Sequence, residues 1–417
     1  MKINYAFFAL FTMLMLTFTA CSSDDVSTSE VSLGLDLSTD IENISVSSGN
    51  FTFTNVTTGT AVTTAYSNAA TAQLPDGLYN VSFSGKASYV QKTNVVVDGK
   101  TVEKEETITE SLQGSQQNLE IVGDNYTLNL KVYLVNAKNN FVIAEIYGVG
   151  THIPGTTKQY NGDQYIRIYN NSDETLYADG LVISESKFTT TLKHDYNPNK
   201  MDEVVTVQVV AMIPGNGTEH PVLPGKSIIV CDNAINHTEA NSNSFDLSNA
   251  DFEWYTASTS SSYPDPDNPL VANLNMLYNY TKTIWALNKQ GVKAYTLSRL
   301  GVSSEEYLAN YTYTYNYMLR TGKISKNYVA YYIPNDWIID AVNLSPKNSY
   351  VWNVTSPSLD MGFTYFGLNN TVKENLGKGV RRKVSYTTAD NREVLLDTNN
   401  SSVDFIPATA PSLANNE

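Results

Sequence analysis

Short stretches of this chain alternate hydrophobic and polar residues with a period of two, and this pattern restricts the fold more than any other feature. Val31, Leu33 and Leu35 alternate with small or polar residues, as do the stretches 79–83 and 128–134. A period of two places the hydrophobic residues of an extended strand on one face. Several such strands with turn residues between them are typical of β-sandwiches. We therefore predict an all-β fold.

Composition agrees with this prediction and excludes one class of partner. Charged residues make up only 17% of the chain, and the 28 tyrosines suit sheets with hydroxyl-rich outer faces. The net charge of −15 makes nucleic acid a poor partner, because an acidic chain repels phosphate backbones. The cysteines are Cys21 and Cys231. We expect Cys231 to be a small buried hydrophobic residue.

The chain begins with a positive residue, Lys2, and an apolar run from Tyr5 to Phe18 that is too short to span a bilayer. Small residues and Cys21 follow this run, and the whole segment resembles a bacterial lipoprotein signal. The resemblance implies that residues 1–20 are removed and that Cys21 is the lipidation site. Several acyl chains hold a protein on a membrane, since each buried methylene contributes about 0.8 kcal/mol.

The polar, acidic residues 21–30 have nothing to bury and are predicted to form a tether. This tether resembles the export tag of surface-exposed lipoproteins in Bacteroidota. The resemblance implies an outer-membrane, lipid-anchored protein at the cell surface.

Residues 31–138 are predicted to form a small β-sandwich. Leu74-Pro-Asp-Gly-Leu-Tyr-Asn-Val-Ser-Phe83 resembles the turn and strand of transthyretin-like, or prealbumin-like, modules. The charged run Lys104-Glu105-Glu106 is expected to lie in a solvated loop or at a sheet edge.

Residues 139–417 are predicted to form a second β-sandwich with insertions near 183–220, 236–280 and 301–330. A strand ending in Tyr169-Asn-Asn-Ser is followed by a turn and a second strand near Gly180, and Leu223-Pro-Gly leads into another strand. These pieces resemble the lamin-tail-type, immunoglobulin-like domain. The full order of signal, small β-domain and interrupted lamin-tail-like domain resembles an uncharacterised family of Bacteroidota lipoproteins.

A short helix is predicted to begin near Ser303, whose hydroxyl is followed by Glu305 and Glu306 in the first turn. The tyrosines from 311 to 317 also alternate with other residues as in a strand, so both alternatives remain open beyond the first turn.

The segment from Tyr307 to Tyr332 holds eight tyrosines. Tyrosine offers a large contact area at low entropic cost and is common in recognition surfaces. We predict binding residues here; packing of the same side chains into the core is the alternative. The candidates are Tyr307, Tyr311, Tyr313, Tyr315 and Tyr317.

Imidazole and carboxylate groups between residues 152 and 237 are the ligands that Zn²⁺ takes. Their spacing is not that of recognised zinc motifs, so we favour ordinary loop residues and assign no cofactor. The candidate metal ligands are His152, His194, Asp232 and His237.

The chain has one cluster of basic residues, at 378–383. We expect the solvated end of a β-hairpin; the functional alternative is docking onto an acidic rim of a membrane partner. The members are Lys378, Arg381, Arg382 and Lys383.

The chain has no G-x-S-x-G elbow and no H-E-x-x-H motif. We therefore predict a non-enzymatic lipoprotein that acts as a binding or accessory component of a TonB-dependent nutrient uptake system. A metal-dependent hydrolase that uses the histidine-containing loops and a structural or adhesive surface protein are the alternatives.

Overall fold

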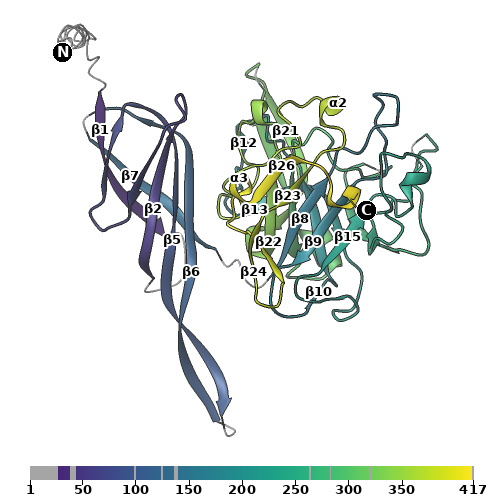
Figure 1. Ribbon diagram of the computed structural model, residues 1–417, viewed down its shortest axis with the longest axis horizontal. Coiled ribbons are helices and arrows are strands. Elements are labelled where there is room, and N and C mark those ends of the chain that lie inside the picture. The colour runs from purple at the N-terminus through teal and green to yellow at the C-terminus, as the bar shows by residue number, and fades with distance from the viewer. Residues whose placement is uncertain are drawn as a thin grey trace, which may run out of the picture.

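The computed structural model describes residues 27–37, 44–97, 100–123, 125–135, 140–262, 264–281, 283–319 and 321–415. Cys21, the predicted lipidation site, lies outside the described residues. Figure 1 shows an N-terminal part in purple and blue and a C-terminal part in teal to yellow, both built mainly of strands. The prediction of an all-β fold is confirmed.

One curved sheet of seven strands forms the N-terminal part. Alternate side chains of its strands point to one side, where Val31, Phe51, Phe53 and Phe83 are almost fully buried. β1 starts at Thr28, so the last residues of the predicted tether already belong to a strand. In sheet order the strands are β3 (Ala61–Ala65), β2 (Ser45–Asn55), β5 (Gly77–Val97), β6 (Lys100–Ile121), β7 (Asn125–Val135), β1 (Thr28–Leu37) and β4 (Thr71–Pro75).

The two longest strands, β5 and β6, project from this sheet as an arm (Figure 1). Pairing of β5 with β2 ends at Ser88, and pairing of β6 with β7 ends at Ser111. Beyond these residues β5 and β6 pair with each other as far as Val97 and Lys100. The charged run at 104–106 lies within this arm, in a strand.

The C-terminal part packs two larger sheets against each other, with short pairs of strands at their margins. The first sheet contains, in order, β12 (Tyr196–Asn197), β20 (Thr312–Met318), β21 (Ile324–Pro334), β13 (Val204–Met212), β11 (Leu181–Ser186), β19 (Ala294–Arg299) and β22 (Ile338–Asn343), and β18 (Asn275–Asn279) also pairs with β13. The second contains β17 (Ala272–Asn273), β16 (Phe252–Glu253), β15 (Ser227–Cys231), β9 (Tyr165–Asn170), β8 (Phe141–Tyr147), β23 (Gly379–Arg382) and β26 (Phe405–Thr409). The short pairs are β10 (Leu176–Tyr177) with β14 (Pro221–Val222), and β24 (Val384–Thr387) with β25 (Glu393–Leu395).

The main core lies between these two sheets. Ile166 and Ile168 of β9 face it from one side and Ile183 of β11 from the other, and all three are fully buried. Arg167, between the two isoleucines, points to the outer face of the second sheet, as the period of two requires. Cys231, in the neighbouring strand β15, is buried and free, as expected of a small hydrophobic residue.

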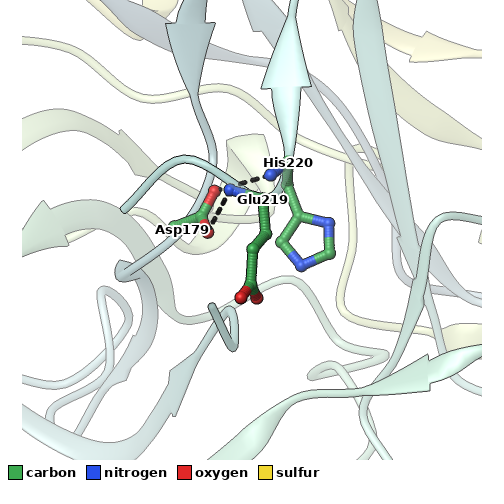
Figure 2. Close-up of side chains that lie close together, drawn as sticks. All are labelled: Asp179, Glu219 and His220. Carbon is green, nitrogen blue, oxygen red and sulfur yellow. Dashed lines mark hydrogen bonds between the residues drawn. The ribbon is translucent and has the colours of Figure 1, made fainter. Parts of the chain in front are cut away.

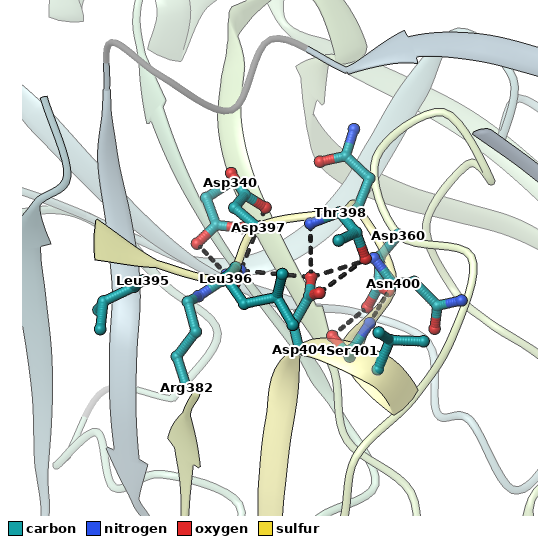
Figure 3. Close-up of polar contacts among 12 residues, drawn as sticks. Asp340, Asp360, Arg382, Leu395, Leu396, Asp397, Thr398, Asn400, Ser401 and Asp404 are labelled. Atoms are coloured by element: carbon teal, nitrogen blue, oxygen red, sulfur yellow. Dashed lines mark hydrogen bonds and ion pairs between the residues drawn. The ribbon is translucent and has the colours of Figure 1, made fainter. Parts of the chain in front are cut away.

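A buried arginine links the two sheets (Figure 3). The Arg382 guanidinium lies 2.7 Å from Asp340 of the first sheet, 3.1 Å from Asp397 and 3.4 Å from Asp404. Its Nε also donates to the Ile143 carbonyl oxygen in β8. The expectation of a wholly solvated basic cluster is therefore wrong for Arg382, which is 4% exposed. Arg382 is buried because it follows the inward-facing Val380 by two residues and therefore lies on the same face of β23.

The helix predicted near Ser303 is present as α1 (Ser304–Asn310), and the Ser303 hydroxyl accepts a hydrogen bond from the Glu306 backbone N–H. The strand pattern is also correct, because β20 follows at Thr312. The other short helices are α2 (Val372–Asn375) and α3 (Ser401–Asp404), and the 3₁₀ turns are η1 (His237–Glu239), η2 (Asn335–Trp337), η3 (Lys347–Ser349) and η4 (Ser412–Asn415). Among the described residues, no helix has the length and hydrophobicity needed to cross a membrane.

Candidate functional site

The β20–β21 hairpin and β12 present a group of aromatic side chains at the edge of the first sheet. Tyr317 pairs with Tyr196 across the two strands, and its ring centroid lies 4.6 Å from that of His194 and 5.1 Å from that of Tyr328. These side chains are half-buried or exposed. We call this group the aromatic face; it consists of His194, Tyr196, Tyr313, Tyr317 and Tyr328.

A buried aromatic layer supports the aromatic face. Tyr315, on the same side of β20 as Tyr317, is 3% exposed, and its ring packs against Phe188 and Tyr328. The Phe188 ring also stacks on Tyr196 with centroids 4.0 Å apart. Rings held from below in this way lose little conformational freedom when a ligand covers them.

Hydrogen bonds and burial shift the pKa values of the tyrosines in the aromatic face. Hydrogen bonds with the Ser325 and Tyr317 hydroxyls lower the pKa of Tyr328. The Tyr317 hydroxyl donates to that of Tyr328, and this hydrogen bond raises the pKa of Tyr317. Burial, more strongly than the neighbouring tyrosines, raises the pKa of Tyr196. Burial also raises the pKa of Tyr313, against the opposing hydrogen bond with the Thr206 hydroxyl. A crevice at the edge of the face has a volume of only about 10 Å³. The face is thus a broad aromatic platform and suits a ligand that stacks on it.

The structure divides the five predicted tyrosines between surface and core. Tyr313 and Tyr317 belong to the aromatic face, whereas Tyr307 is fully buried against Tyr331 and Tyr315 forms the supporting layer. Tyr311 lies apart from the face and packs against Trp337 with ring centroids 4.9 Å apart. Some tyrosines of this segment thus lie at the surface, where they could bind a ligand, and others pack into the core.

The four candidate metal ligands lie in different surroundings. His237 is buried; its Nδ1 lies 3.0 Å from the Tyr160 hydroxyl and its Nε2 lies 2.8 Å from the Asn233 carbonyl oxygen. The exposed His152 contacts Asn243, and the His194 ring packs against Tyr317 within the aromatic face. Asp232 is buried and accepts a hydrogen bond from the Trp254 indole. Over the described part of the chain, these four residues do not form a group of ligand atoms suited to one metal ion.

One group of possible metal ligands does occur among the described residues, and it consists of Asp179, Glu219 and His220 (Figure 2). The Asp179 carboxylate accepts hydrogen bonds from the backbone N–H groups of Gly217, Glu219 and His220. Burial opposes ionisation of Asp179, but these N–H groups outweigh it and hold its pKa below the ordinary value. Gly215 is required here, because a Cβ atom would lie 2.0 Å from an Asp179 carboxylate oxygen. The group therefore fixes a loop, and we assign it no metal.

Sequence reasoning did not identify three members of the aromatic face as binding residues. Tyr196 lies far from the tyrosine-rich segment along the chain, and only the pairing of β12 with β20 brings it there. Tyr328 could have been identified from the sequence, because it belongs to the segment of eight tyrosines. His194 was considered as a metal ligand, whereas in the structure its ring packs against that of Tyr317.

Comparison with known proteins finds a family to which part of this chain is similar. Residues 223–412 match the family model described as "Protein of unknown function (DUF4876)". A similar solved structure is the crystal structure at 2.50 Å resolution of a DUF4876 family protein from Bacteroides thetaiotaomicron VPI-5482. It is 21% identical, with a TM-score of 0.56, and the alignment covers 93% of this chain and 97% of that one. At this identity the likeness shows the fold alone. No curated protein matches the chain. Residues 223–412 of the chain are thus similar to the uncharacterised DUF4876 family.

Proposed function

We propose that this chain is a lipid-anchored, surface-exposed protein of the outer membrane that binds a ligand or partner through the aromatic face. It would serve a TonB-dependent nutrient uptake system as an accessory component. The observation that carries the binding proposal is the aromatic face itself, a set of closely packed aromatic rings on a supported hairpin. Aromatic side chains of this kind dominate the binding energy of many interfaces.

The sequence supports the remainder of the proposal. The apolar run before Cys21 and the acidic residues after it support lipidation and export to the surface. The order of sequence motifs supports a transthyretin-like N-terminal part and a lamin-tail-like C-terminal part. In this arrangement the N-terminal part is a spacer between the membrane and the aromatic face.

Removing the half-buried Tyr317 ring and the exposed Tyr328 ring of the aromatic face should weaken binding without changing stability. We expect Tyr317→Ala/Tyr328→Ala to lose about 2–4 kcal/mol of affinity, because large aromatic anchors contribute this much at interfaces. Capture of solubilised outer-membrane proteins and binding to a panel of oligosaccharides measure the loss. Tyr177→Ala is a matched control, since Tyr177 is 39% exposed and Tyr328 is 38% exposed.

A buried ring of the same strand should give the opposite result. Tyr315→Ala is expected to lower the free energy of unfolding by about 3–5 kcal/mol, because it leaves a cavity in the supporting layer. If Tyr317→Ala/Tyr328→Ala lowered stability as much as Tyr315→Ala does, the aromatic face would be part of the core and the proposal would fail.

Cys21 should be the point of membrane attachment. Cys21→Ala is expected to move the chain from the membrane fraction to the soluble fraction, because the acyl chains then have no thiol to join. Fractionation and metabolic labelling with a fatty acid measure the change. A variant that remained in the membrane fraction would contradict lipid anchoring at Cys21.

A further inference from the structure

A groove lies on the outer face of the second sheet, away from the aromatic face. One hollow of about 320 Å³ is lined by Arg167, Arg381, Lys383 and Ile406 among others. A second hollow of about 430 Å³ shares Arg167 with the first and extends past Lys226 and Arg392. Pockets of 300–1,000 Å³ are typical of small-molecule sites.

The groove has a charge opposite to that of the chain. Two acidic residues, Asp390 and Glu393, line it. Five basic residues with outward-facing side chains also line the groove, although the net charge of the whole chain is −15. Those five are Arg167, Lys226, Arg381, Lys383 and Arg392. A local excess of positive charge in a concave surface attracts anions despite the net charge of the protein.

Two arginines flank a single carboxylate across the sheet. Arg381 of β23 pairs with Glu145 of β8, and Glu145 pairs with Arg167 of β9, so the three side chains share the outer face. Strand spacing places the backbones of the two arginines about 10 Å apart. The Glu145 carboxylate is already occupied, because it accepts hydrogen bonds from the Tyr165 hydroxyl and from the backbone and hydroxyl of Ser412.

The guanidinium groups of Arg167 and Arg381 are therefore available to bind an anion. Among the described residues, neither Arg167 nor Arg381 forms an ion pair, and the Arg381 side chain has no hydrogen bond. Arg167 donates to the hydroxyls of Ser227 and Ser412, which orient its guanidinium. Guanidinium groups bind carboxylates through two parallel hydrogen bonds.

We propose that this groove binds a small organic acid, with Arg167 and Arg381 as the residues that recognise its carboxylates. The size of the first hollow suits a compound with several carboxylates. Ile406 and Val384, which are 39% and 45% exposed, line the same hollow and offer apolar contact to the carbon skeleton.

Isothermal titration with citrate tests the proposal, and the uncharged trimethyl ester of citrate is the matched neutral probe. We expect saturable binding of citrate, no binding of the ester, and at least tenfold weaker binding of citrate by Arg381→Gln and by Arg167→Gln. Lys347→Gln removes an exposed positive charge outside the groove and should bind as the wild type does. Arg381→Lys keeps the charge but not the paired donors, and should have intermediate affinity.

Three results would overturn the proposal: no saturable binding of citrate, equal binding of the ester, or unchanged affinity in both arginine variants. Equal binding of sulfate at the same residues would show a general anion site and would contradict carboxylate recognition. Thermal melting of each variant separates lost binding from lost folding, and Arg381→Lys decides the case if Arg381→Gln does not fold. Binding through the aromatic face stands independently of all these results.

Discussion

Replacing Arg382 with methionine is expected to destabilise the C-terminal part by about 3–5 kcal/mol, because breaking a buried ion pair leaves its partners unpaired. Arg382 contacts Asp340, Asp397 and Asp404, and methionine would leave these carboxyl groups in the core without a cation. The hydrogen bond to the Ile143 carbonyl oxygen would also be lost.

Tryptophan fluorescence during urea unfolding measures this effect selectively. The tryptophans at 254, 285, 337 and 352 all lie in the C-terminal part, so the signal reports on that part alone. Arg381→Met is the matched control: Arg381 neighbours Arg382 but faces the outer groove, and its loss should change stability by less than about 0.5 kcal/mol. An Arg382→Met variant as stable as Arg381→Met would contradict the assigned role of the network.

Stability should fall as pH rises from 5 to 8. Burial raises the pKa of Asp232 to about 8, and the charge of Asp265 adds to the effect. Burial also raises the pKa of Asp340 to about 7, because Arg382 is shared among several carboxyl groups and does not offset the desolvation. The same cause raises the pKa of Asp404 to about 6.

The sign follows from proton binding. Between the ordinary carboxyl value and these raised values, the folded chain binds more protons than the unfolded chain, so raising the pH favours unfolding. We expect a loss of about 2 kcal/mol or more between pH 5 and pH 8, since each unit of displacement corresponds to about 1.4 kcal/mol. Above pH 8 the opposite effect begins, because burial lowers the pKa of Lys293 to about 8.

Replacing Asp232 with asparagine isolates the largest single contribution to this pH dependence of stability. Asp232→Asn keeps an acceptor for the Trp254 indole but cannot ionise, so its stability should depend less on pH and exceed that of the wild type at pH 8. Asp202→Asn, which removes an exposed carboxyl group, should keep the wild-type dependence. A wild-type slope in Asp232→Asn would show that Asp232 is ionised throughout this range.

Patterns local in sequence predicted much of the fold. Alternation from Val31 and around Phe83 predicted strands, and both stretches are strands with buried alternate residues. Ser303 and Glu306 predicted the start of α1, because a helix N-cap is a contact between residues close in the chain. The β5–β6 arm was not predicted, since charged residues in a strand without a covered face lack the alternating pattern.

The candidate site depends on contacts distant in sequence, and these were predicted less well. The tyrosine-rich segment drew attention to Tyr317, but Tyr196 and His194 join it only through strand pairing across more than a hundred residues. Composition also does not distinguish Tyr317 from the buried Tyr315, because exposure depends on what packs against each ring.

Site-specific photo-cross-linking in intact cells tests the central claim, binding through the aromatic face, most directly. A photoreactive phenylalanine at position 328 or 317 should cross-link to a partner. The same residue at position 177, which is as exposed as position 328 but lies outside the face, should not. The account predicts that the partner captured from position 328 is a TonB-dependent receptor or a component bound to one. Cross-links from position 177 with none from positions 317 and 328 would contradict the account.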